Sequence, residues 1–169
     1  LQGTTGVVMT GATITTTSAE AVTKANVTDL NGFTDAKVTV TSVKDSRSNV
    51  TDIAGIDNAL VDMGDAVVTI TDAVSLSEAN ALNLLTDGKI TLNSVADTYA
   101  NIQDIKKIND AQIDMGAAAV QVTSVTNKTE IDDLRTNDTT GDITVDSISD
   151  NKDNLGTCLL YTSDAADEL

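Results

Sequence analysis

The sequence lacks several residue types on which common kinds of site depend. Its 169 residues include no histidine, proline or tryptophan, one cysteine and 2% aromatic residues. Without histidine, the chain has neither a Cys/His zinc set nor a Ser-His or Cys-His nucleophile pair. So few aromatic residues are also too few to form the centre of an ordinary globular domain. We therefore expect no catalysis, and a core made from Val, Ile, Leu and Ala.

Basic residues are scarce as well. The chain has 10 Lys and Arg against 26 Asp and Glu, a formal net charge of -16. Nucleic acids and anionic membrane surfaces bind clustered Lys and Arg, so we expect neither as a partner. No apolar run reaches the roughly 18 residues that a membrane-spanning helix needs, so membrane insertion is not expected either.

The main feature that the sequence does contain is a repeat. Residues 37–66 and 89–118 agree at 14 of 30 positions, where unrelated sequence would give roughly two. The offset of 52 residues covers one long unit of about 30 residues and one short unit of about 22. After a leading fragment at 1–11, the predicted units are 12–36, 37–66, 67–88, 89–118, 119–141 and a truncated 142–157.

Each unit opens with a predicted strand, because apolar and Thr-like residues alternate there with period two. The six segments are 12–15, 38–41, 68–71, 90–93, 120–123 and 143–146. Apolar residues at spacing three, such as Ile102, Ile105 and Ile108, predict a helix between strands. A further helix near Ser77 is expected to end at Asp87-Gly88. Alternating strands and helices predict an α/β fold, an open solenoid of stacked strand-helix units with a parallel sheet. A parallel β-helix is the alternative.

The predicted strands place apolar residues inward and Thr outward. The inward row is Val38/Val40, Val68/Ile70, Ile90/Leu92, Val120/Val122 and Ile143/Val145. The outward row begins with Thr13/Thr15, Thr39/Thr41 and Thr69/Thr71 and continues with Asn93, Gln121 and Asp146. Such a flat Thr ladder resembles the Thr arrays of ice-binding solenoids. Thr is also simply a favourable polar residue for an exposed strand face.

Acidic residues recur at equivalent positions after the strands. Asp45, Asp97 and Asp150 could line a calcium row, although neighbours about 10 Å apart cannot share one ion. The alternative is that they cap helix N-termini. Glu78 and Glu130 also align, and we expect first-turn helix charges rather than a catalytic pair. No catalytic, cofactor-binding or metal-binding residue is therefore assigned.

The last residues differ from the rest. Residues 158–168, CLLYTSDAADE, resemble the translation of a sequencing adapter, so we expect 158–169 to be an artefact of a metagenomic fragment. With no initiator Met and a unit that breaks off, the chain is expected to be an internal piece of a longer protein.

The phrases Ser77-Glu78-Ala79-Asn80-Ala81-Leu82 and Asp97-Thr98-Tyr99-Ala100-Asn101-Ile102 follow Thr-rich strands. They resemble repeats of large bacterial cell-surface and secreted proteins, such as S-layer-like and RTX-type adhesins. The resemblance spans about residues 12–155 and implies an extracellular stalk or adhesive surface, in a setting that can be rich in calcium. The calcium-binding nonapeptide repeat is absent from this sequence.

These observations predict a structural or adhesive repeat segment of an extracellular bacterial surface protein, whose main partners are neighbouring repeats of the same chain. One alternative is a binding module that uses the Thr face for ice, a glycan or a mineral; a calcium-stabilised repeat is another. The processive domain of a polysaccharide-degrading enzyme is a third, but the sequence offers no paired acids in one cleft.

Overall fold

The computed structural model describes residues 9–17, 19–56, 60–108 and 112–155. Strands and helices alternate along this part of the chain. The strands are β1 (Ile14–Thr15), β2 (Val38–Thr39), β3 (Ser42–Asp45), β4 (Val61–Asp62), β5 (Val67–Val74), β6 (Ile90–Asp97), β7 (Ile113–Asp114), β8 (Ala119–Thr126) and β9 (Ile143–Ile148). The helices are α1 (Lys24–Phe33), α2 (Arg47–Gly55), α3 (Leu76–Asn83), α4 (Tyr99–Ile105), α5 (Lys128–Asp133) and the π-helix η2 (Leu134–Asp138). The expected tail at 158–169 lies outside the described residues.

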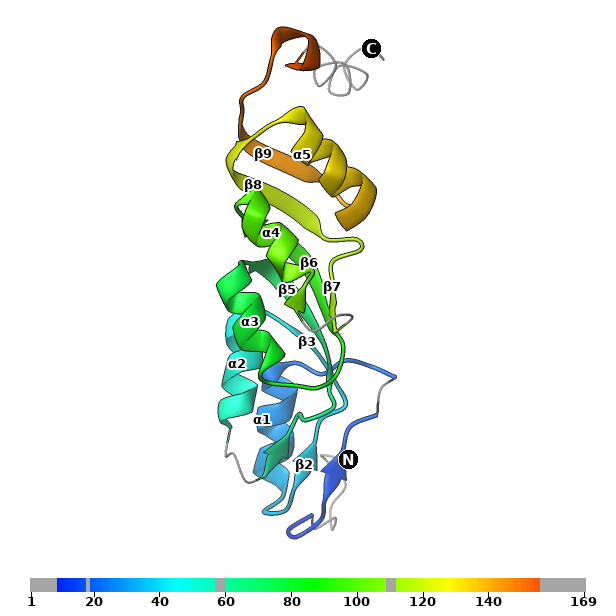
Figure 1. Ribbon diagram of the computed structural model, residues 1–169. Coiled ribbons are helices and arrows are strands. Elements are labelled where there is room, and N and C mark those ends of the chain that lie inside the picture. The colour runs from blue at the N-terminus through cyan, green and yellow to red at the C-terminus, as the bar shows by residue number, and fades with distance from the viewer. Residues whose placement is uncertain (1–8, 18, 57–59, 109–111, 156–169) are drawn as a thin grey trace, which may run out of the picture.

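All strand pairs are parallel, and strand order follows chain order. One sheet has the order β1-β2-β4 and the other β3-β5-β6-β8-β9, with β7 paired to β6. Figure 1 shows the strands stacked from the N-terminal to the C-terminal end of an elongated molecule, with α1 to α4 in a column beside them. The α/β class with parallel strands is thus confirmed, and each of the six predicted strand segments contains a strand.

The register differs from the expected single strand per unit. In each complete long unit, the chain comes back to form a second, two-residue strand, β4 or β7, that pairs with the first strand of the same unit. Val38 pairs with Val61, and Ile90 pairs with Ile113. The strand of the following short unit therefore pairs only with the later strand residues of the long unit, as Val68 of β5 does with Val43 of β3. The expectation that Val38 lies beside Val68 is wrong, because β4 occupies that place.

The core lies between the strands and the helices. The predicted inward residues Val38, Val40, Val68, Ile70, Ile90, Leu92, Val120 and Val122 are all buried, while Ile143 and Val145 are partly buried. From the helix side, Val50, Ile53, Ile102 and Ile105 have no exposed surface. The alternation of period two and the helical spacing of three thus meet in one apolar layer.

The expected helix stop at Asp87-Gly88 is also wrong. Helix α3 ends at Asn83, and its C-cap Leu84 keeps right-handed helical backbone angles. Gly88 instead lies just before β6, where a Cβ atom would come within 2.2 Å of the Ala66 carbonyl oxygen. The glycine is therefore needed because two units approach closely there, and not as a helix terminator.

Candidate functional site

The polar side chains that recur from unit to unit gather at the starts of the helices. Each of the helices α1 to α5 has an N-cap side chain that accepts a hydrogen bond from the backbone amide three residues later, which satisfies one of the free donors of the first turn. The N-caps are Thr23, Ser46, Ser75, Thr98 and Asn127. These caps follow from the local sequence, since Ser, Thr and Asn are preferred at this position.

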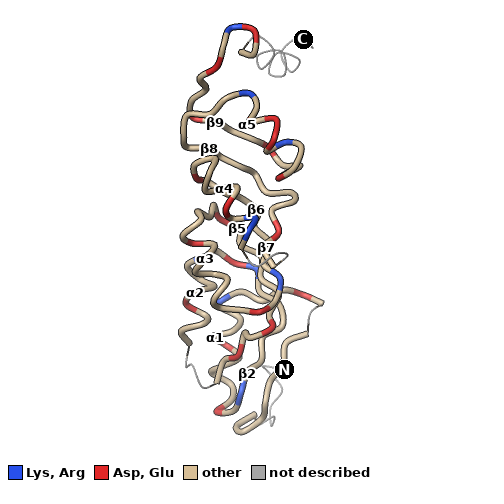
Figure 2. Tube along the Cα trace, in the orientation of Figure 1, with Lys and Arg blue, Asp and Glu red and all other residues tan. Residues whose placement is uncertain are grey.

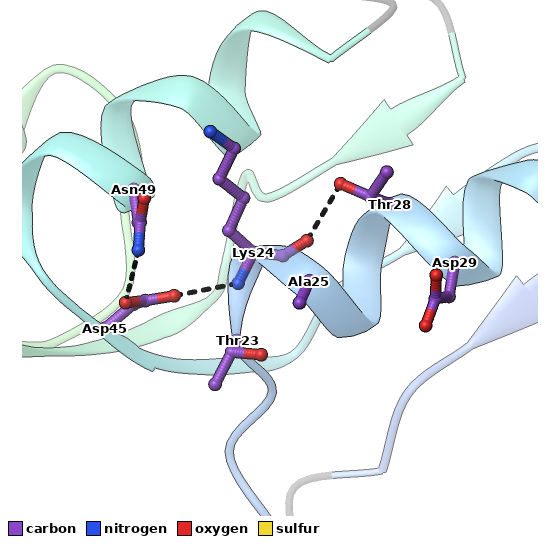
Figure 3. A pocket seen from close by; sticks show the side chains of 7 residues that line it. All are labelled: Thr23, Lys24, Ala25, Thr28, Asp29, Asp45 and Asn49. Atoms are coloured by element: carbon purple, nitrogen blue, oxygen red, sulfur yellow. Dashed lines mark hydrogen bonds between the residues drawn. The ribbon is translucent and has the colours of Figure 1, made fainter.

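Asp45 adds a second layer to this arrangement. Its Oδ2 accepts from the backbone amide of Lys24, at 2.9 Å, while Oδ1 accepts from Asn49 Nδ2 and from the Ser46 amide, each at 2.8 Å. Figure 3 shows the carboxylate between Lys24 of α1 and Asn49 of α2, at the edge of an open polar hollow. Burial raises the pKa of Asp45, but these hydrogen bonds outweigh it and hold the pKa below its ordinary value of 3.8.

The same contact recurs between every pair of successive units. In each case the first amide of a helix donates to a side chain at the end of the next unit's strand, 21 to 25 residues later. The pairs are Lys24 with Asp45 (2.9 Å), Arg47 with Asp72 (2.7 Å), Leu76 with Asp97 (2.9 Å), Tyr99 with Ser124 (3.2 Å) and Lys128 with Asp150 (3.0 Å). We call these five acceptors the capping column.

The capping interpretation of the aspartates is confirmed, with one correction. Asp45, Asp97 and Asp150 cap the helix of the preceding unit, in addition to accepting from the amide that follows them. Asp72 and Ser124 perform the same task in the short units. The column is therefore continuous through both kinds of unit.

In long units, a second side chain of the same unit donates to the column Asp. In long units an Asn four residues after the Asp donates Nδ2 to it, at 2.8 Å from Asn101 to Asp97 and from Asn154 to Asp150. Burial raises the pKa of Asp97, yet the bonds from Leu76, Asn101 and Thr98 keep that pKa below its ordinary value. The pKa of Asp150 is lowered chiefly by the bond from the Lys128 amide.

The short units that contain α3 and α5 carry the aligned glutamates. Glu78 accepts from the Ser75 amide at 2.8 Å and Glu130 from the Asn127 amide at 3.1 Å, so each completes a capping box. Both lie in the first turn of their helices. Their predicted role as first-turn charges is confirmed.

The capping column does not have the arrangement of a calcium row. The two oxygens of Asp45 accept three hydrogen bonds, and those of Asp97 do the same. Among the described residues, no group of three or more Asp or Glu side chains is placed to hold a metal ion. Calcium needs six to eight oxygen ligands, and these carboxylates already have protein donors.

A second column, which was not predicted from the sequence, lies just after the C-terminal ends of α1, α3 and η2. Thr34, Thr86 and Thr139 are buried, with 4 to 5% of their surface exposed. The Thr86 hydroxyl donates to the Ala66 carbonyl of the preceding unit, at 2.7 Å, and accepts from the Gly88 amide at 2.9 Å. Thr34 and Thr139 make the equivalent bonds to the Ala12 and Ala118 carbonyls, both at 2.5 Å. We call these residues the threonine column.

One junction contains a buried carboxylate. The Asp138 side chain, at the end of η2, has no exposed surface and is bonded to Gln103 of α4 and to Lys106, the C-cap residue of that helix. Nearby, the Tyr99 hydroxyl donates to Asp133 at 2.8 Å, and this bond raises the pKa of Tyr99 to about 12. These contacts join the fourth and fifth units, and the carboxylate acts there as a structural acceptor.

The outward Thr row is exposed or half-exposed, as expected, but it is not an uncharged ladder. Thr39 lies between Thr15 and Asp62, and Thr69 lies between Lys44 and Thr91. Asp62 is paired with Lys37 at 2.5 Å, and Asp114 with Lys89 at 2.6 Å. Because the two-residue strands β4 and β7 bring these ion pairs onto the face, the hydroxyl spacing is interrupted at both complete long units.

Charge is spread over the whole molecule. Figure 2 shows Asp and Glu along the entire stack, with Lys and Arg dispersed among them. Over the described residues, no helix is long and apolar enough to cross a membrane. Comparison of the chain with protein-family models, with curated proteins and with solved structures gives no match.

Proposed function

We propose that this chain is a structural repeat segment of a large extracellular bacterial surface protein. In this proposal the units form an open α/β solenoid that serves as a stalk or adhesive spacer, without catalysis and without a cofactor. Its principal partners are the neighbouring repeats of the same chain.

The observation that carries the proposal is the capping column. Five successive junctions use one contact, from the first amide of a helix to a side chain of the next unit. The recurring polar groups of long and short units are thus used in joining units to each other. Because these recurring polar groups are already hydrogen-bonded between units, the segment is better suited to holding units together than to binding and releasing a ligand.

Two features support an extended spacer in particular. The strand order follows the chain order, so added units lengthen the stack instead of closing it. The net charge of -16 makes such stacks repel one another and remain soluble. The Thr-face binding module receives less support, because Lys44, Asp62 and Asp114 interrupt the hydroxyl rows.

The spacer role can be tested by surface display. One, two and three tandem copies of the 169-residue chain would be placed between an outer-surface anchor and an epitope tag. We expect the height of the epitope above the cell surface to rise in equal steps with copy number. A height that does not change with copy number would refute the spacer role.

The metal-free character of the repeat has its own test. Circular dichroism and thermal melting of the full chain would be compared with and without millimolar calcium. We expect the same spectrum and midpoint, because the column carboxylates are already bonded to protein donors. A large calcium-dependent gain in structure would instead favour a calcium-stabilised repeat.

A further inference from the structure

We propose that Asn31 is a site of spontaneous deamidation, at which the side-chain amide leaves as ammonia and an aspartate or an isoaspartate takes its place. Water is the only co-reactant, and the attacking group belongs to the chain itself. The inference is independent of the spacer role, because it depends on the chemistry of one Asn-Gly pair and on its place near the end of α1.

The nucleophile in this reaction is the backbone nitrogen of the next residue. The Gly32 nitrogen attacks Asn31 Cγ and gives up its proton, the C–N bond of the side-chain amide breaks, and ammonia leaves with that proton. One water molecule then opens the succinimide ring at either carbonyl, which gives aspartate or isoaspartate. The ring forms only when the two reacting atoms come into contact, and a side chain on the second residue obstructs that approach.

The surroundings of the pair favour the attack. Asn31-Gly32 is the one Asn-Gly pair in the sequence. It lies in the last turn of α1, which ends at Phe33, and Gly32 is exposed. Helical backbone angles hold the Gly32 nitrogen away from Asn31 Cγ, so the last turn must open first. Helix ends open at little cost in free energy, and glycine has the lowest helix propensity after proline.

An inner unit supplies a matched comparison. Asn83, near the end of α3, has the place of Asn31 at the repeat offset of 52 residues. Within the described residues, neither Asn31 Oδ1 nor Asn83 Oδ1 accepts a hydrogen bond. The two amides are therefore alike in this respect, but Gly32 follows one and Leu84 follows the other. The leucine side chain obstructs the attack that the glycine permits.

The exposure of this position does not depend on where the chain begins. Leu84 is 84% exposed, although α3 lies between α2 and α4 (Figure 1). The place after the aligned Asn therefore faces solvent even in a unit that has neighbours on both sides. Water can reach a succinimide formed at Gly32 for the same reason.

The asparagines of the long units are restrained. Asn49, Asn101 and Asn154 each donate Nδ2 to the Asp of their own unit at 2.8 Å. A hydrogen bond to a carboxylate holds the amide in place and must break before Cγ can be attacked. Each of these three residues is also followed by a bulky Val, Ile or Leu.

The products would weaken one contact of the threonine column. A carboxylate at position 31 adds negative charge near the C-terminal end of α1, where the helix dipole is already negative. Isoaspartate also lengthens the backbone by one methylene group shortly before Thr34, whose hydroxyl donates to the Ala12 carbonyl at 2.5 Å. We expect this contact to loosen with time, while those of Thr86 and Thr139 remain.

The test is incubation of the folded 169-residue chain in mildly alkaline buffer, with peptide mapping by mass spectrometry at successive times. Conversion at Asn31 should be at least about tenfold faster than at Asn83. An isoaspartyl methyltransferase should label the peptide that contains residue 31. Circular dichroism at each time point confirms that the chain stays folded.

Two variants separate the role of the glycine from that of the position. Gly32→Ala should slow conversion at least about fivefold, because the higher helix propensity of Ala alone lowers the open fraction by that factor. Leu84→Gly should make Asn83 reactive at the equivalent place in α3. Conversion at Asn31 no faster than at Asn83, an unchanged rate in Gly32→Ala, or an inert Asn83 in Leu84→Gly would overturn the proposal.

The structural consequence has a separate readout. Asn31→Asp reproduces one of the two products and should lower the melting temperature by about 2 °C. The incubated parent chain should show a falling midpoint as the modified fraction grows, and incubated Gly32→Ala should keep its own midpoint. A parent chain that converts at Asn31 without any change in midpoint would contradict the expected loosening at Thr34.

Discussion

In the short units, the two ends of the helical segment contact neighbouring units by different physical means. After the C-terminal ends of the helices, the threonine column is buried. Gly88 and Gly141 lie so close to the preceding unit there that a Cβ atom would be 2.2 to 2.3 Å from a carbonyl oxygen. At the helix starts, the capping column is only partly buried, or exposed at Asp72, and uses carboxylates at four of its five positions. The edge at the C-terminal ends of the helices, called the buried edge below, is thus specified by close packing and neutral hydrogen bonds. The edge at the helix starts, called the charged edge, is specified mainly by charged carboxylates. Repeats can vary at the second edge, as Asp72 and Ser124 do, more easily than at the first.

The largest effect should come from filling the close approach at the buried edge. Gly88→Ala would force its Cβ into the Ala66 backbone, and we expect a loss of about 3 kcal/mol in unfolding free energy. Gly32→Ala is the matched control, because nothing lies within 4 Å of its Cβ position in α1, and it should be neutral or stabilising by up to about 1 kcal/mol. Urea denaturation of both variants measures the difference, and equal losses would contradict the close-approach argument.

A smaller loss should follow removal of a threonine hydroxyl from the same edge. Thr86→Val keeps the shape of the side chain but leaves the Ala66 carbonyl and the Gly88 amide without this partner. We expect a cost of about 2 kcal/mol. Thr71→Val, on the exposed strand face, should change stability by less than about 0.5 kcal/mol. If both variants melt alike, the threonine column does not stabilise the stack.

The charged edge should be more tolerant. Asp45→Ala removes the bonds to the Lys24 amide and to Asn49, and we expect a loss of about 1 kcal/mol, as for other helix caps. Asp29→Ala removes the same charge from the same hollow, where Figure 3 shows no bond to its side chain. Its unfolding free energy should stay within about 0.5 kcal/mol of the parent chain. A comparable loss in both would mean that charge alone, and not capping, is at work.

The smallest expected effect is a difference between the two edges in how the unfolding free energy depends on pH. The folded chain holds the pKa of Asp45 and Asp97 below 3.8, so these carboxyls bind fewer protons when folded than when unfolded. Their stabilisation is present above about pH 4 and is lost as the pH falls through the lowered pKa. Asp45→Ala should therefore flatten the acid dependence of the unfolding free energy, whereas Thr86→Val should leave its slope unchanged. Denaturation between about pH 5 and pH 2.5 measures both slopes.

The sequence predicts the strands and their inward row well, because period two is strong at Val38-Thr39-Val40 and its counterparts. It does not reveal β4 and β7, since two residues are too short to show any period. The error in register follows from this omission. The helix faces at Ile102 and Ile105 were predictable for the same reason as the strands, from regular spacing.

The candidate site was predictable in position but not in its connections. Asp45 and Asp97 are recognisable as potential caps, yet their second partners lie 21 residues earlier, in another unit. A single sequence does not indicate which amide a carboxylate will reach across a junction. Thr86 gave no signal beyond its place two residues before Gly88, because Thr is common throughout this chain.

The direction of the capping bonds has a consequence for how the chain is made. Each helix start receives its last acceptor from residues that are synthesised 21 to 25 positions later. A growing chain therefore always carries one unfinished unit at its leading end, while the units behind it are complete. Synthesis of such an array would proceed as stepwise growth on completed units, with the most recently made unit always the least stable part of the molecule.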